Sequence, residues 1–205
     1  MTDGRGGSDT DPVTIRVGNT PPTATITTPA AGTTWRVGDV INFSGSATDP
    51  QQGNLPASAL SWSLILHHCP SNCHEHPLQT FPGVASGSFT APDHEYPSYL
   101  ELQLTATDSG GLSHTVTRRL DPRTVVLTFA TNPGGLRLTV NGTQATATFT
   151  RTVIIGSTNS ISAVTPQTKG KQTYTFTSWS DGGAQTHNIV APATATTYTA
   201  RFKNR

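Results

Sequence analysis

The chain has 205 residues, of which 13 are Lys or Arg and 12 are Asp or Glu, so that its formal net charge is +1. It contains 37 Thr, 19 Gly and 15 Pro, and no stretch approaches the roughly 18 consecutive apolar residues of a membrane-spanning helix. Because Thr suits a pleated, half-buried surface and Gly and Pro separate strands, the composition excludes long helices and predicts an all-β protein.

The small net charge conceals an uneven distribution. Residues 20–122 contain eight acidic and three basic residues, whereas residues 123–205 contain eight basic residues and one acid, Asp181. Such a break indicates two domains. The halves could attract each other, the second could meet acidic surfaces, or the charges could be two unrelated solvated faces. The basic residues of the second half are dispersed, so we do not expect nucleic-acid binding.

The first residues repeat a pattern found later in the chain. Residues 3–17 and 108–120 each run from an acid through a Gly-Gly turn into an alternating strand, which in the second case closes a domain. We therefore expect residues 1–18 to be the last strand of an upstream module, left by excision with an added start Met. Its edges at 11–18 would need cover from its own chain or from another copy in a homo-oligomer.

Residues 19–22 (Asn-Thr-Pro-Pro) form a stiff linker, because two prolines restrict the backbone. The first body, 23–122, is predicted to be an immunoglobulin-like sandwich with Trp62 in its core. Its strands are expected at 23–28, 34–36, 40–46, 60–66, 86–90, 98–107 and 113–120. The Pro-, His- and Cys-rich segment 67–82 is expected to be a loop.

The second body, 123–205, has hairpin turns at Asn132–Gly135, Asn141-Gly142 and Asp181–Gly183. Its strands are expected at 124–130, 135–140, 145–154, 159–164, 172–179, 186–190 and 196–202. The sequence thus predicts an Ig-like sandwich followed by a second small β domain.

The densest cluster of chemically active residues lies in the first body. It comprises His67, His68, Cys69, Cys73, His74, Glu75 and His76, followed by Asp93, His94 and Glu95. Imidazoles bind zinc or copper, and reduced thiols would complete a tetrahedral site. The alternative is a disulfide between Cys69 and Cys73 that ties a loop whose histidines and acids hydrogen-bond locally. The disulfide is the favoured state of the cysteines, and a transition-metal site at the histidines stays open.

Two further kinds of site are candidates. Asp39, Asp49 and Asp108 lie in turns expected at matching ends of strands, where they could bind calcium or cap the turns as Asx turns. Aromatic residues beside polar groups suit a pyranose, which offers C–H faces and hydroxyl edges. The candidates are Trp179 with Asp181 and Gln185, Tyr96 and Tyr99 with Asp93 and Glu95, and Trp35. Each Trp could instead belong to the core.

Catalytic patterns are poorly represented. Gly83-Val-Ala-Ser-Gly87 has its serine misplaced for a nucleophile elbow, and no predicted helix offers a phosphate-binding turn. Asp93 and Glu95 would share one face of a strand and would not flank a cleft, as the carboxylates of glycosidases do. We therefore expect a non-catalytic protein.

Several motifs resemble known secreted proteins. Asn19-Thr-Pro-Pro22, Gly45-Ser-Ala-Thr-Asp49 and Thr105–Gly111 resemble PKD and related Ig-like repeats of secreted bacterial proteins. Residues 55–122, with His67-His-Cys69, Cys73-His-Glu-His-Pro77 and Ala91–Pro97, are similar to the non-catalytic C-terminal region of PQQ-dependent (glucose/sorbosone) sugar dehydrogenases. Phe176–Gly183 and Ala191–Tyr198 resemble divergent InlB-type β repeats that follow such regions.

This resemblance implies an accessory region beside a catalytic propeller, whose catalytic His and quinone-binding residues have no counterpart here. Residues 1–18 would then belong to an upstream PKD-like domain. The expected function is that of a secreted accessory or adhesive module that contacts carbohydrate or a cell-surface polymer, without membrane insertion. The alternatives are a surface or fibre subunit that assembles through strand 11–18, and a His-rich metal-binding domain.

Overall fold

The computed structural model describes residues 18–205. The predictions made for residues 1–17, including all but the last residue of the leftover strand at 11–18 that pairs within or between chains, lie outside the described residues. Within 18–205, no helix is long and apolar enough to cross a membrane.

The regular secondary structure of the described chain consists almost entirely of strands. They are β1 (Thr23–Thr28), β2 (Thr34–Trp35), β3 (Val40–Asp49), β4 (Gly53–Asn54), β5 (Leu60–His68), β6 (His74–Pro82), β7 (Ser86–Thr90), β8 (Ser98–Thr107), β9 (Ser113–Pro122), β10 (Thr124–Asn132), β11 (Arg137–Val140), β12 (Thr143–Thr146), β13 (Phe149–Ile154), β14 (Thr158–Ala163), β15 (Gln167–Lys169), β16 (Gln172–Trp179), β17 (Thr186–Val190) and β18 (Thr196–Asn204). The 3₁₀ turn η1 (Ala57–Ala59) precedes β5. The predicted all-β class is confirmed.

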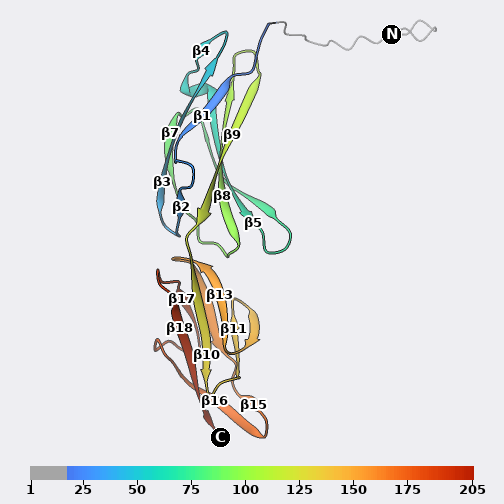
Figure 1. The fold of residues 1–205 in the computed structure, drawn as a ribbon, viewed down its shortest axis with the longest axis vertical. Coiled ribbons are helices and arrows are strands. Elements are labelled where there is room, and N and C mark those ends of the chain that lie inside the picture. Colours follow the sequence, from blue (N-terminus) through green and yellow to red (C-terminus); the bar gives the residue numbers. More distant parts are fainter. Residues whose placement is uncertain (1–17) are drawn as a thin grey trace, which may run out of the picture.

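The first module is a sandwich of two sheets (Figure 1). One sheet has the order β2-β9-β8-β5-β6, and the other has β3 between β1 and β4, with β7 also paired to β3. Period-two alternation drives the packing, since Leu100, Leu102 and Leu104 of β8 are fully buried on one face. Trp62 is also fully buried, and its indole N–H donates to the Val84 carbonyl at 2.9 Å. The predicted role of Trp62 in the core is confirmed.

The prediction that 67–82 is a loop is wrong. β5 continues to His68, and β6 runs back beside it from His74 to Pro82, so that only the hairpin tip remains as a loop. Backbone pairing with β5 outweighs the polar composition of this segment. Pro77 is tolerated because β6 is an edge strand and Pro77 lies at a shift in the register.

The second module pairs a sheet of order β13-β10-β18-β16-β15 with one of order β12-β11-β14-β17. Its buried side chains form a separate core that includes Leu127, Phe129 and Trp179. The single strand predicted at 145–154 is two strands, because the chain passes at residues 147–148 from the second of these sheets to the first.

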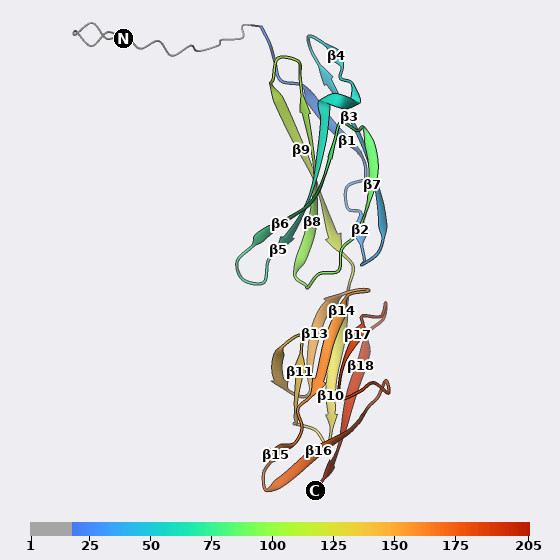
Figure 2. The same ribbon diagram turned by 180° about the vertical axis from the view of Figure 1, so that it is seen from behind.

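The modules follow one another end to end (Figures 1 and 2) and share specific contacts. Ile154 of β13 is fully buried and belongs to the core of the first module. The Arg123 backbone N–H donates to the Trp35 carbonyl at 2.6 Å, and its guanidinium contacts the Asp39 carboxylate at 2.6 Å. Val37 donates to the Ile155 carbonyl at 3.1 Å. The junction is therefore a packed interface.

A substitution at Gly45 can test the packing of the first sandwich. A Cβ there would lie 2.6 Å from the Thr25 carbonyl oxygen and 2.7 Å from Leu104 Cδ2. Since the first contact is with the backbone of the paired strand β1, we expect Gly45→Ala to lower the free energy of unfolding by about 1–3 kcal/mol. Gly134→Ala is the matched control, because a Cβ at Gly134 meets no atom within 4 Å. Equal denaturant midpoints for the two variants would contradict this packing.

Candidate metal centre

The β5–β6 hairpin positions three histidines on one face. His68 of β5 lies directly opposite His74 of β6, and His76 follows two residues after His74. Side chains two residues apart in a strand share a face, so His68 continues the row of Leu64 and Leu66 that points into the sandwich. The inward-facing side chains of β5 are therefore apolar as far as Leu66, and the last of them, at the end of the sheet, is the imidazole of His68.

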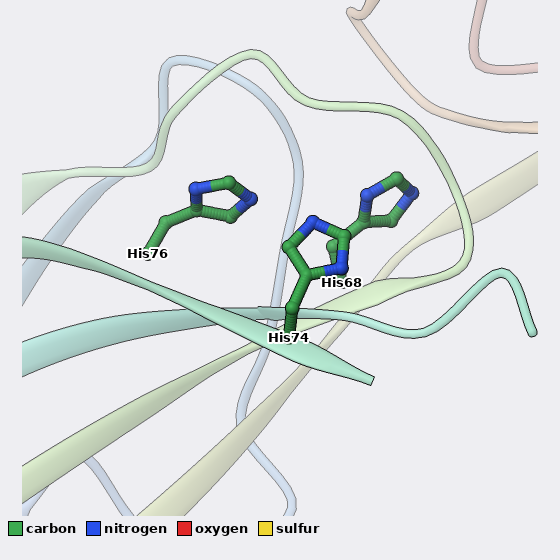
Figure 3. A group of neighbouring side chains, drawn as sticks. All are labelled: His68, His74 and His76. Atoms are coloured by element: carbon green, nitrogen blue, oxygen red, sulfur yellow. The ribbon is translucent and has the colours of Figure 1, made fainter. Parts of the chain in front are cut away.

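The three imidazoles converge in space. One ring nitrogen of each of His68, His74 and His76 lies within 4.8 Å of the others. Figure 3 shows the rings of His68 and His74 next to each other, with that of His76 farther along β6. His68 is half-buried, whereas His74 and His76 are exposed.

A fourth histidine closes the group from the β7–β8 loop. The His94 ring centroid lies 4.7 Å from that of His68 and 5.5 Å from that of His76. His74 completes the circuit, at 5.1 Å from His68 and 4.8 Å from His76. His94 Nδ1 lies 3.1 Å from the Glu95 carbonyl oxygen. When Nδ1 carries the proton and donates there, the lone pair of Nε2 is left for a ligand.

Electrostatics favour the neutral state of His68. Burial lowers its pKa below the ordinary value of 6.5, and the neighbouring His94 and His74 lower it further, while Glu95 acts in the opposite direction. A metal binds the lone pair of a neutral imidazole, so a low pKa keeps this side chain in the form that a metal requires.

The four histidines border an open pocket of about 450 Å³ that also includes Asp93, Glu95, Thr158 and Asn159. Thr158 donates its backbone N–H to the Asp93 carboxylate, at 3.0 Å to Oδ2 and 3.3 Å to Oδ1. Asp93 is therefore bound to the second module. Glu95 remains the carboxylate of the pocket that could join the imidazoles.

The structure does not place His67 in this group, so its prediction as a metal ligand is wrong, and Glu75, which belongs to the same cluster in the sequence, also lies apart. Both side chains lie on the opposite face of the hairpin, because successive residues of a strand point to opposite faces. His67 directly precedes His68, and Glu75 lies between His74 and His76. The His67 ring stacks on Tyr99 at 4.5 Å between centroids. Its nitrogens lie 3.8 Å from Glu75 and 3.8 Å from Glu101.

The two cysteines are joined. Cys69 and Cys73 form a disulfide that closes the tip of the hairpin, immediately after His68 and immediately before His74. No thiolate ligand is therefore present. The donor set of the site consists of imidazoles, with Glu95 alongside.

The donor atoms are of the kinds that a small transition-metal ion prefers. Zinc–nitrogen bonds of about 2.0–2.1 Å place two nitrogens of a tetrahedral site roughly 3.3 Å apart. The present limit of 4.8 Å between ligand atoms is thus about 1.5 Å too wide. Closing this gap requires the exposed side chains of His74 and His76 to move toward His68. Imidazoles suit zinc, copper and nickel, and calcium and magnesium prefer oxygen ligands.

The aromatic candidates of the second module form part of its framework. Trp179 is 3% exposed, so its ring cannot serve as a platform and that prediction is wrong. Its indole donates to the Gln185 carbonyl at 3.1 Å, and the Gln185 amide donates to the Ala163 carbonyl at 2.9 Å. Asp181 lies 3.0 Å from His187 and accepts from Gly183. Trp35 of the first module is likewise fully buried.

The remaining aromatic candidates, Tyr96 and Tyr99, share a hollow that contains neither of the acids expected beside them, although Glu95 and Tyr96 both border a second, smaller hollow. Tyr96 is 44% exposed and Tyr99 is half-buried. Asp93 and Glu95 border the histidine pocket, whereas Arg119 and Asp121 accompany the two tyrosines. Sequence reasoning missed Arg119 and Asp121. Counting back from the Gly110-Gly111 hairpin would have placed Arg119 opposite Glu101, on the same face as Tyr99.

The calcium candidates do not share one end of the sandwich. Asp39 lies at the junction, where it binds Arg36 and Arg123. Asp49 and Asp108 lie at the other end and act as turn residues: Asp49 Oδ1 accepts from the N–H groups of Gln51 and Gln52. Asp108 accepts from the backbone N–H of Leu112 and the Asn19 amide, each at 2.8 Å. These contacts are those of the Asx-turn alternative.

No protein-family model matches the sequence, and no curated protein matches it.

The turn at Asp108 predicts a pH dependence of stability. Burial acts to raise the pKa of Asp108, but hydrogen bonds from Leu112, Asn19 and the neighbouring glycines outweigh it and hold the pKa below 3.8. A lowered carboxyl pKa contributes stability that is complete above 3.8 and disappears as the pH falls through the folded-state pKa. Asp108→Asn should therefore lower Tm at neutral pH.

Thermal unfolding measured as a function of pH tests this prediction, because the difference in Tm between the wild type and Asp108→Asn should shrink below pH 3.8. Asn19→Ala removes one donor and should give a smaller shift in the same direction. A difference in Tm that stays constant with pH would show that the Asp108 charge does not contribute.

Proposed function

We propose that this protein binds one first-row transition-metal ion, such as zinc or copper, through His68, His74 and His76, with His94 as the fourth ligand. The observation that carries the proposal is the convergence of three imidazole nitrogens within 4.8 Å, with the His94 ring completing the circuit. Four imidazoles are a donor set typical of these metals.

The hydrogen bonding of the histidines supports a ligand role. His114 accepts from the Ala24 N–H, and His187 contacts Asp181 and the Ala184 carbonyl. Within residues 18–205, by contrast, no hydrogen bond involves the ring nitrogens of His68, His74 or His76. A group of imidazoles that only stiffened the loop would be expected to use these nitrogens in local hydrogen bonds.

The disulfide supports both the site and its compartment. It fixes the hairpin tip between His68 and His74, so these side chains begin close to their ligating positions. Disulfides persist in oxidising environments such as the extracellular space. We therefore assign the protein to a secreted or surface setting, where it acts as a non-catalytic accessory module. The resemblance of 55–122 to the accessory region of sugar dehydrogenases agrees with this assignment.

The metal would link the hairpin to the β7–β8 loop, because three ligands come from β5 and β6 and the fourth from that loop. By the usual order of stability, copper(II) should bind more tightly than nickel or zinc. Binding requires neutral imidazoles and should weaken under acidic conditions.

Calorimetric titration of the metal-free full chain with zinc and with copper(II) tests the proposal. We expect one equivalent to bind and His76→Gln to weaken binding by about tenfold or more, because even partners of metal ligands cost 10–100-fold when lost. Glu75→Gln is the matched control, since this exposed neighbour lies on the opposite face of the same strand. Absence of binding, or equal losses in the two variants, would overturn the proposal.

The disulfide provides a separate prediction. Replacing both cysteines, Cys69→Ser with Cys73→Ser, should weaken zinc binding several-fold, because the hairpin tip must then lose more conformational freedom on binding. The tip lies outside the buried core, so the near-UV circular dichroism of Trp35 and Trp62 should be retained. An unchanged zinc affinity in the double variant would show that the disulfide does not preorganise the site.

A further inference from the structure

A second site lies on the other face of the β5–β8–β9 sheet, beside the junction of the modules. It is an open hollow of about 500 Å³, called here the tyrosine hollow, lined by the disulfide, Tyr96, Pro97, Ser98, Tyr99, Arg119, Asp121, Pro122 and Thr124. Its volume falls within the approximate range of 300–1,000 Å³ that is common for small-ligand sites. It shares no lining residue with the histidine pocket.

Tyr96 is the aromatic surface of this site. Its side chain is 44% exposed, although it is large and apolar. It also borders a smaller hollow of about 210 Å³ between the β7–β8 loop and the second module, which includes Glu95, Asn141 and Arg151. Tyr96 therefore stands between two hollows, and an extended ligand could contact it from both.

Arg119 and Asp121 provide fixed polar groups beside it. The Arg119 guanidinium carbon lies 3.7 Å from the centroid of the Tyr99 ring, whose other neighbour in the stack is His67. Arg119 Nε donates to Asp121 Oδ1 at 2.9 Å. Because stacking and this ion pair both orient the guanidinium, its terminal N–H groups and the second carboxylate oxygen are held at the surface as a donor and acceptor set.

We infer that the tyrosine hollow binds a neutral oligosaccharide. A pyranose presents an apolar C–H face that packs on an aromatic ring, and hydroxyl groups that both donate and accept hydrogen bonds. Tyr96 supplies the ring, Arg119 the donors and Asp121 the acceptor. This inference goes beyond metal binding and does not depend on it, because the two sites use different residues on opposite faces of one sheet.

The charge of the hollow favours a neutral ligand over an anionic polymer. The positive charge of Arg119 is balanced by Asp121 at 2.9 Å, and both side chains are more than half exposed. The excess of basic residues in 123–205 belongs to the second module, where it could attract polyanions without any defined site. A change in salt concentration distinguishes binding of a neutral sugar from binding of a polyanion. Screening weakens attraction between exposed charges and leaves stacking and hydroxyl contacts intact.

The experiment uses the full chain with chelator present, so that metal binding does not contribute. Cellohexaose, xylohexaose, mannohexaose and chitohexaose are titrated by calorimetry, with polygalacturonate as the anionic comparison, at about 0.15 M and about 0.5 M sodium chloride. The variants are Tyr96→Ala and Arg119→Lys. Leu78→Ala is the control, because Leu78 is an equally exposed apolar residue on β6 that does not line the hollow.

We expect at least one neutral hexasaccharide to bind at both salt concentrations. Tyr96→Ala should weaken this binding by about tenfold or more, in line with the loss of a central aromatic contact. Arg119→Lys should weaken it by a smaller factor, while Leu78→Ala and His76→Gln leave it unchanged.

Four results would overturn the inference. Three of them are binding of no neutral hexasaccharide, binding of polygalacturonate alone that disappears at the higher salt concentration, and an affinity that Tyr96→Ala leaves unchanged. The fourth is loss of sugar binding in His76→Gln, since the two sites would then not be independent. Failure of this inference leaves the zinc titration unaffected, so the two proposals stand or fall separately.

Discussion

The two-residue period of β5 and its neighbours is the constraint on which both candidate sites depend. Leu64 and Leu66 must point into the sandwich to bury their side chains, and this requirement carries His68 to the same face. It equally forces His67 to the outside, against Tyr99. A shift of one residue in this strand would exchange the two histidines and expose the core leucines. Hydrophobic burial therefore determines which histidine can reach the metal pocket and which one supports the tyrosine hollow.

The β7–β8 loop connects the candidate sites of the first module with the second module. His94 turns toward the hairpin histidines, Asp93 accepts from Thr158 of β14, and Tyr96 borders a hollow of β11–β13. Three residues of one short loop thus serve the metal pocket, the junction and, because Tyr96 also lines it, the tyrosine hollow. The loop is held at both ends by strands of the sandwich, which gives its side chains defined positions without regular structure of their own.

Much of the fold could be predicted from the sequence, because alternation in β8 and the Gly-rich turns are local signals. The β6 strand could not, since its exposed, polar residues show no alternation and are ordered by pairing with β5. The sequence indicated which residue types form the candidate site, because the histidines are clustered. It could not show that His67 and Glu75 lie on the other face of the hairpin, since this depends on how β5 and β6 pair. Trp179 looked the same in sequence whether it formed a core or a platform, and only the packing of both sheets around it distinguishes them.

Ile154 belongs to the second module by its position in the chain and to the first module by its packing. It stands about thirty residues beyond the end of β9, yet its side chain is fully buried with Trp35 and Leu120 in the first core. The point in the chain where the first module ends, near Pro122, therefore does not coincide with the boundary between the two cores. A gene fragment that stops at Pro122 would therefore encode a first module that lacks one buried side chain of its own core.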